Sequence, residues 1–125
     1  MADELSGCRV LVVEDEPIVA FDLAEILERH GATVVGWAGN VADARRLVAG
    51  SQMDCAVLDV DLGRESVAPL VRELGVLQIP FVFMTGYDEK DLSPLWRAHP
   101  ILHKPMLAAE LVDALSRVCS FGPAL

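Results

Sequence analysis

The chain has 125 residues, 53% of them hydrophobic, and a formal net charge of −9. This size and composition suit one globular domain and exclude a disordered chain. The ten Lys and Arg residues form no cluster, which argues against nucleic-acid binding because phosphate contacts need concentrated positive charge. No apolar run reaches the roughly 20 residues of a membrane span, and the acidic N-terminus lacks a signal-peptide pattern. We therefore expect a cytoplasmic protein that binds neither nucleic acid nor membrane.

The three cysteines are far apart in the sequence and odd in number. Cys8, Cys55 and Cys119 show no Cys-x-x-Cys spacing, which argues against a zinc site or a disulfide framework. Cys8 and Cys55 fall in apolar runs, so we expect them to be small core residues.

Short apolar runs alternate with amphipathic stretches along the chain. The short apolar runs predict strands at 9–13, 33–38, 54–58, 79–84 and 101–103. The stretches between them have helical spacing and predict helices at 17–30, 41–49 and 66–75, and a final helix with Leu107, Leu111, Leu115 and Val118 on one face. The polar segment 88–100 predicts at most a short helix near 92–98. This alternation is typical of a parallel sheet with helices on both faces.

Chemically capable residues follow four of the five predicted strands. Glu14 and Asp15 follow the first strand, Asp59 the third, Thr85 the fourth and Lys104 the fifth. Parallel strands bring their carboxyl ends to one rim of the sheet, where ligands bind in open α/β folds. Singly, each residue has a plainer interpretation, such as a turn-forming Asp or a solvated Lys. Their joint placement favours a functional site.

A cluster of carboxylates at such a rim has definite chemistry. Two carboxylates about 5 Å apart repel by roughly 3 kcal/mol at an effective dielectric of 20, so the cluster needs a cation or a proton. Carboxylate oxygens together with waters suit Mg²⁺. Asp59 is placed to attack phosphorus as a nucleophile. Thr85 and Lys104 are the predicted partners of the transferred phosphoryl oxygens.

At this point residues 8–118 resemble a response regulator receiver domain. The resemblance implies a flavodoxin-like α/β fold, a doubly wound five-stranded parallel sheet of order 2-1-3-4-5, in a single domain at 1–125. The motifs that carry it are Glu14-Asp15, Asp59, Thr85-Gly86 and Lys104-Pro105.

The family also implies a signalling role rather than that of an enzyme. Asp59 would accept a phosphoryl group from a sensor histidine kinase or a histidine phosphotransfer protein, in a self-catalysed reaction that needs Mg²⁺. Asp15 and Asp59 would ligate the metal directly, together with the backbone carbonyl of Asp61. Glu14 would act through water. The output would pass through protein–protein contacts to a target that the sequence does not identify.

Two departures from the family pattern bear on switching. Ile101 stands where typical receivers have an aromatic switch residue, three positions before the Lys. The run 80–87 resembles a Phe-Ala-Thr-Gly-Tyr subgroup that includes many stand-alone receivers, with Met84 in place of the Ala. Tyr87 would then either help order the segment 87–100 on phosphorylation or pack on the surface, and both interpretations stay open. The family's cis peptide would fall at Lys104-Pro105.

Two other functions remain possible from the sequence. One is an interaction module that keeps the fold without phosphorylation. The other is a small Mg²⁺-dependent phosphohydrolase of the haloacid dehalogenase class, suggested by the Asp59-x-Asp61 spacing. We favour the phosphoacceptor, as a complete single-domain chain that is a monomer or weak homodimer.

Overall fold

The sheet has the strand order that the sequence analysis predicted. The structure is a computed structural model that describes residues 4–63, 65–86 and 98–119. Its strands are β1 (Arg9–Val13), β2 (Thr33–Ala38), β3 (Cys55–Asp59), β4 (Phe81–Thr85) and β5 (Ile101–His103). They form one parallel sheet in the order β2-β1-β3-β4-β5, so the predicted α/β fold class and topology are confirmed.

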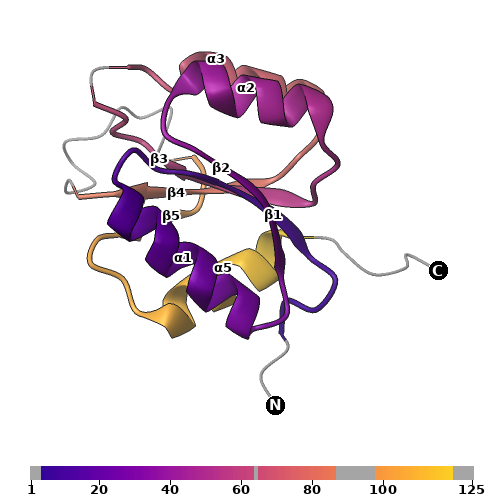
Figure 1. Cartoon of the computed structure of the whole chain (residues 1–125), viewed down its shortest axis with the longest axis vertical. Helices are drawn as coiled ribbons and strands as arrows, with labels where there is room; N and C mark the ends of the chain where they lie inside the picture. The colour runs from indigo at the N-terminus through magenta and orange to yellow at the C-terminus, as the bar shows by residue number, and fades with distance from the viewer. Residues whose placement is uncertain (1–3, 64, 87–97, 120–125) are drawn as a thin grey trace.

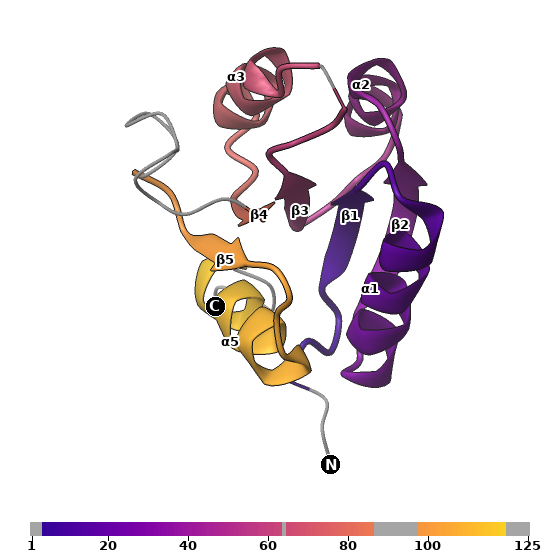
Figure 2. The ribbon, with the colours of Figure 1, turned by 90° about the vertical axis from the view of Figure 1, so that its left-hand side faces the viewer.

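Helices cover both faces of this sheet. They are α1 (Pro17–Arg29), α2 (Val41–Gly50), α3 (Ala68–Val76) and α5 (Ala108–Val118). Helices α1 and α5 lie on one face, and α2 and α3 on the other (Figure 1, Figure 2). Alternate residues of each central strand therefore enter two separate hydrophobic clusters, such as Val12 on the α1 side and Val13 on the α2 side. Burial on both faces explains why these strands are continuous apolar runs.

Local signals explain where several helices begin. The Asn40 Oδ1 accepts a hydrogen bond of 2.8 Å from the Asp43 backbone N–H at the start of α2, an N-cap interaction. Pro17 opens α1, where a missing N–H costs no helical hydrogen bond.

Some predicted boundaries need correction. Helix α3 starts at Ala68, after Ser66, and continues through Gly75 to Val76. Leu107 precedes α5 and is 70% exposed, so the prediction that it joins the buried helix face is wrong. Its backbone N–H instead donates to Glu110 Oε1.

Other predictions fall on residues that the structure does not describe. Tyr87 and most of the possible helix near 92–98 lie in the range 87–97, outside the described residues. Among the described helices, none is long and apolar enough to cross a membrane.

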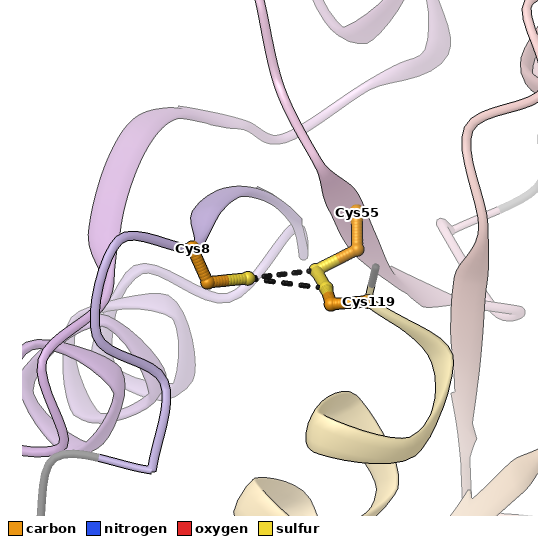
Figure 3. Close-up of side chains that lie close together, drawn as sticks. All are labelled: Cys8, Cys55 and Cys119. Carbon is orange, nitrogen blue, oxygen red and sulfur yellow. Dashed lines mark hydrogen bonds between the residues drawn. A yellow bond between two sulfur atoms is a disulfide. The ribbon is translucent and has the colours of Figure 1, made fainter. Parts of the chain in front are cut away.

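The cysteines differ from the prediction. Cys8 and Cys55 are fully buried, as expected for core residues. However, Cys55 and Cys119 form a disulfide, with Cys8 beside it (Figure 3), contrary to the cysteine spacing, which argued against a disulfide framework. Parallel pairing sets the start of β3 beside the start of β1, where Val10 aligns with Cys55. The end of α5 returns to the same place, a proximity that sequence spacing does not reveal.

Candidate functional site

The acidic residues after β1 and β3 meet because the two strands pair in register. Val13 aligns with Leu58, so Glu14 and Asp59 follow at neighbouring positions of the rim. Both are buried, with relative exposures of 0% and 2%. Asp15, which is exposed, completes a group whose carboxylate oxygens lie within 4.8 Å of one another.

Lys104 places a positive charge between the two buried acids. Its Nζ donates to Glu14 Oε1 at 2.9 Å and to Asp59 Oδ2 at 2.8 Å. The residue follows β5, and its backbone N–H donates to the Thr85 carbonyl oxygen at 2.8 Å. The Lys104–Pro105 peptide bond is cis. Lys104 thus joins the ends of three different strands.

Backbone and side-chain donors hold the carboxylates in place. The Asp61 N–H donates to Asp59 Oδ1 at 2.8 Å, and the Glu16 N–H donates to Glu14 Oε2 at 3.1 Å. Trp37 Nε1 donates to the Glu14 backbone carbonyl at 2.6 Å. In each carboxylate, one oxygen therefore accepts a hydrogen bond from the Lys104 ammonium and the other accepts one from a backbone N–H. These two bonds fix the orientation of the carboxylate.

Burial and charge act against each other on these groups. Burial raises the pKa of Glu14 to about 7, outweighing the hydrogen bonds from Lys104 and Glu16. Burial also disfavours the charged form of Lys104, but its hydrogen bonds to Asp59 and Glu14 outweigh that effect and raise the pKa of Lys104. The cluster therefore keeps a firmly charged ammonium beside a carboxyl group that changes protonation near neutral pH.

A small cavity opens onto this cluster. It has a volume of about 250 Å³ and is lined by Asp15, Glu16, Asp59, Asp61, Gly63, Gly86 and Lys104. A cavity of this size suits a small anion or a hydrated ion rather than a large substrate.

The cavity lining includes residues that the sequence analysis did not assign to the site. They are Glu16 and Gly63. Gly63 has a φ of +60°, a conformation that favours glycine. An Asp-x-Asp-x-Gly sequence after a buried strand is the signal that could have identified it.

Thr85 has a different position from the other candidates. It is fully buried at the end of β4, the strand beside β3, where Asp59 aligns with Met84. Among the described residues, the following Gly86 rather than Thr85 lines the cavity. The rim thus brings Glu14, Asp59 and Lys104 into direct contact, with Thr85 in the neighbouring strand.

The donor set fits a hard divalent cation. Asp15 and Asp59 contribute carboxylates to the cavity, and Glu14 adds a third nearby. Carboxylate oxygens, with water completing the shell, are the ligands that Mg²⁺ prefers. The residues present therefore fit Mg²⁺.

Comparisons with known proteins show which family this fold belongs to. Residues 10–116 match the family described as the response regulator receiver domain. The transcriptional regulatory protein PdtaR of Mycobacterium tuberculosis is 32% identical over 123 residues, covering 95% of this chain and 60% of PdtaR. The chain thus spans less than two thirds of that curated relative.

Solved structures of SdrG have the same fold. The solution structure of SdrG from Sphingomonas melonis Fr1 superposes with a TM-score of 0.79 at 37% identity, over 89% of this chain and 95% of SdrG. The solution structure of the BeF3-activated conformation of SdrG from Pseudomonas melonis Fr1 gives a TM-score of 0.77 at 35% identity, over 89% of this chain and 98% of that one. Together with the matched range of 10–116, these likenesses identify the chain as a member of the response regulator receiver domain family.

Proposed function

We propose that Asp59 accepts a phosphoryl group from a phosphohistidine, in a reaction that needs Mg²⁺. The observation that carries the proposal is the contact of Lys104 with both Glu14 and Asp59 beside a small acidic cavity. An oxygen of the Asp59 carboxylate bonds to phosphorus as the bond from phosphorus to the histidine nitrogen breaks. The ring nitrogen leaves with that electron pair, and Asp59 becomes an acyl phosphate.

The acidic residues of the cavity supply the metal site in this proposal. Asp15 and Asp59 would hold Mg²⁺ together with the backbone carbonyl of Asp61, and Glu14 would act through water. A cation held there would supply positive charge against the phosphoryl oxygens. Asp59 is phosphorylated and later restored once per signal, so the protein acts as a signalling component rather than a turnover enzyme.

Lys104 and Thr85 stabilise the transferred group in the proposed reaction. The Lys104 ammonium exchanges its hydrogen bond to the Asp59 carboxylate for one to a phosphoryl oxygen, where its raised pKa keeps it charged. The Thr85 hydroxyl donates to another phosphoryl oxygen. Thr85 ends β4, which lies beside β3, and Lys104 follows β5, which lies beside β4. The positions of both residues therefore depend on the intact sheet.

Intact-protein mass after incubation with a small phosphodonor tests the phosphoacceptor. We expect a phosphoryl adduct that requires Mg²⁺ and is absent from Asp59→Asn. The matched control is Asp61→Asn, which keeps the backbone carbonyl and so should keep the adduct. Loss of the adduct in Asp61→Asn, with turnover of a phosphoester by the parent protein, would instead favour the phosphohydrolase alternative.

A beryllofluoride experiment tests the same site in the case that the protein accepts no small phosphodonor. Because the relative SdrG has a BeF3-activated conformation, beryllofluoride is a suitable mimic of the phosphorylated state. Binding observed by fluorine NMR in the parent, and lost in Asp59→Asn, supports the proposal. Failure of both the adduct and beryllofluoride binding would overturn it in favour of the unphosphorylated interaction module.

We also propose where the phosphohistidine protein docks. An apolar groove of about 500 Å³ is lined by Pro17, Ile18, Ala20, Phe21, Ala24 and Trp37. Ile18 and Phe21 are 78% and 68% exposed, and exposed apolar patches of this kind mark protein contacts. The groove begins at Pro17, directly after Glu16 of the acidic cavity. A donor protein in the groove would therefore bring its phosphohistidine close to Asp59.

Transfer from a histidine kinase or phosphotransfer protein tests this docking site. Phe21→Ser should slow transfer from the protein donor by roughly tenfold, the loss typical of a central interface aromatic. Phosphorylation by a small donor should not change. Val76→Ser is the matched control, because Val76 is 82% exposed on another helix, α3. Equal slowing in both variants would contradict the proposed site.

A further inference from the structure

Three sulfur atoms meet at the end of the sheet opposite the acidic cavity. Cys8 Sγ lies 3.4 Å from Cys55 Sγ and 3.1 Å from Cys119 Sγ, and Cys55 and Cys119 are joined as a disulfide (Figure 3). Each sulfur comes from a different part of the fold. Cys8 immediately precedes β1, Cys55 begins β3, and Cys119 follows the last residue of α5.

The disulfide joins the central sheet to the end of the final helix. Helix α5 packs on the sheet through Leu111, Val112 and Leu115, all in the same buried cluster as the three cysteines. Cys119 directly follows this helix, and its backbone N–H donates to the Leu115 carbonyl oxygen at 2.8 Å. A covalent bond at Cys119 therefore holds the last turn of α5 against the start of β3.

We propose that Cys55 and Cys119 are a reversible peroxide-responsive thiol pair that locks the end of α5 to the sheet when oxidised. A peroxide converts the Cys119 thiol to a sulfenic acid and is itself reduced to water or an alcohol. The Cys55 sulfur then bonds to the Cys119 sulfur. The sulfenic oxygen leaves with the Cys55 proton as water. A dithiol reductant reverses the lock by exchange, becoming a disulfide as both protein thiols are restored.

The relative exposure of the three cysteines indicates which of them reacts first. Cys119 is 7% exposed at a helix end, whereas Cys8 and Cys55 are fully buried. Helix ends open locally more readily than central strands, so Cys119 is the point of entry for oxidant and reductant. Burial raises the pKa of the Cys8 thiol to about 12, which keeps Cys8 protonated and unreactive. Cys8 therefore fills space beside the disulfide.

A metal bound by all three sulfurs is the main competing use of this cluster. The three sulfur atoms lie within 4.8 Å of one another, and three thiolates can bind a soft cation. Such a site would bury three negative charges in an apolar cluster. The neighbouring Arg9 is already paired with Asp54, at 3.1 Å. Uncompensated buried charge is costly, so the cluster favours the neutral thiol and disulfide forms.

Trypsin digestion offers a direct test because it separates the three cysteines. Cleavage after Lys and Arg leaves Cys8 in peptide 1–9, Cys55 in 47–64 and Cys119 in 118–125. The full chain is reduced, treated with hydrogen peroxide, alkylated under denaturing conditions and digested. We expect peptides 47–64 and 118–125 to be linked and peptide 1–9 to be alkylated. Dithiothreitol added before alkylation should release the link.

Two cysteine variants and a zinc-binding control distinguish the proposed thiol pair from the alternatives. Cys8→Ala should keep the link, and Cys119→Ser should abolish it. Hydrogen exchange should show slower exchange in the last turn of α5 in the oxidised parent than in the reduced one. A link that contains peptide 1–9, three alkylated cysteines after peroxide, or one equivalent of Zn²⁺ retained by the reduced protein through dialysis would each overturn the proposal.

Discussion

The carboxyl ends of β1 and β3 carry charged side chains, whereas their amino ends carry neutral sulfur atoms. At their carboxyl ends lie the buried acids Glu14 and Asp59, held by Lys104. At their amino ends lie Cys8 and Cys55, buried among apolar side chains. The same two strands, in the same register, therefore bring together a charged cluster at one end of the sheet and a sulfur cluster at the other.

The difference shows how each end tolerates its polar atoms. The acids at the carboxyl end need an ammonium, backbone N–H donors and an open cavity, because uncompensated buried charge is costly. The sulfur atoms at the amino end are neutral, so they pack in the core without such partners. The carboxyl end should thus respond to pH and cations, and the amino end to oxidants.

The largest expected effect is the loss of stability when the disulfide is reduced. The bond spans 64 residues of sequence, and closing a loop of this length stabilises the folded state by about 4 kcal/mol in the chain-entropy view. Urea unfolding with and without dithiothreitol measures the difference. Cys8→Ala should show the same difference as the parent. Equal stability of the oxidised and reduced forms would show that the disulfide at the amino end does not stabilise the fold.

The next effect comes from removing the ammonium at the carboxyl end. In Lys104→Met, the buried Glu14 and Asp59 lose their shared partner, and we expect a loss of roughly 3 kcal/mol at pH 8 without divalent cations. A raised carboxyl pKa penalises the ionised folded state. The penalty is therefore absent below the unfolded pKa of about 4.3 and complete above the folded pKa.

Chemical unfolding from pH 5 to pH 8 checks this expectation. The gap between Lys104→Met and the parent should widen as pH rises. Lys104→Arg, which keeps the charge, is the control and should lose less. A pH-independent gap would indicate that Lys104 contributes packing rather than charge.

A smaller effect should appear in Mg²⁺ binding. Glu14 has a pKa of about 7 and is protonated below it, which removes one negative charge from the proposed metal site. Affinity should therefore weaken roughly tenfold from pH 8 to pH 6. Calorimetric titration at both pH values measures this. Glu14→Gln should flatten the pH profile, and an unchanged profile would remove Glu14 from the site.

The smallest effect concerns a charge pair at the amino end. Arg9 donates to Asp54 through its backbone N–H and its side chain, and the Arg9 hydrogen bond lowers the pKa of Asp54. A lowered carboxyl pKa stabilises the fold above the unfolded pKa of about 3.9, and that stability is lost as pH falls through the folded pKa. Partly exposed pairs contribute up to about 1 kcal/mol.

Asp54→Asn keeps one acceptor oxygen for the Arg9 backbone N–H, and it removes the charge together with the oxygen that accepts from Arg9 Nη2. The variant should be less stable than the parent at pH 7, and the two should converge toward pH 3 in urea unfolding. Asp113→Asn, which removes an exposed pair with Arg117, is the control. A difference that persists at pH 3 would assign the effect to geometry instead of charge.

The architecture was largely predictable because local pattern and topology agree. Continuous apolar runs predicted the strands, and alternation with helices predicted a parallel sheet. From that topology, strand-end residues such as Glu14, Asp59 and Lys104 were expected at one rim, where the structure places them. Their roles in phosphoryl transfer and metal binding stay predictions.

The remaining features depend on contacts that spacing does not encode. The disulfide of Cys55 and Cys119 needs the end of α5 to meet the start of β3. The joint contact of Lys104 with Glu14 and Asp59 depends on side-chain reach across three strands. Single-domain organisation over 1–125, cytoplasmic location, and the monomer or weak homodimer remain predictions.

The hydrogen bond from Trp37 to the Glu14 carbonyl gives the acidic cavity an optical reporter. Trp37 is 48% exposed, and its indole nitrogen lies 2.6 Å from that carbonyl oxygen. The chain has two tryptophans, so Trp96→Phe would leave Trp37 as the only indole fluorophore. Its emission would then report on changes at Glu14 in a mixing experiment, without any attached dye.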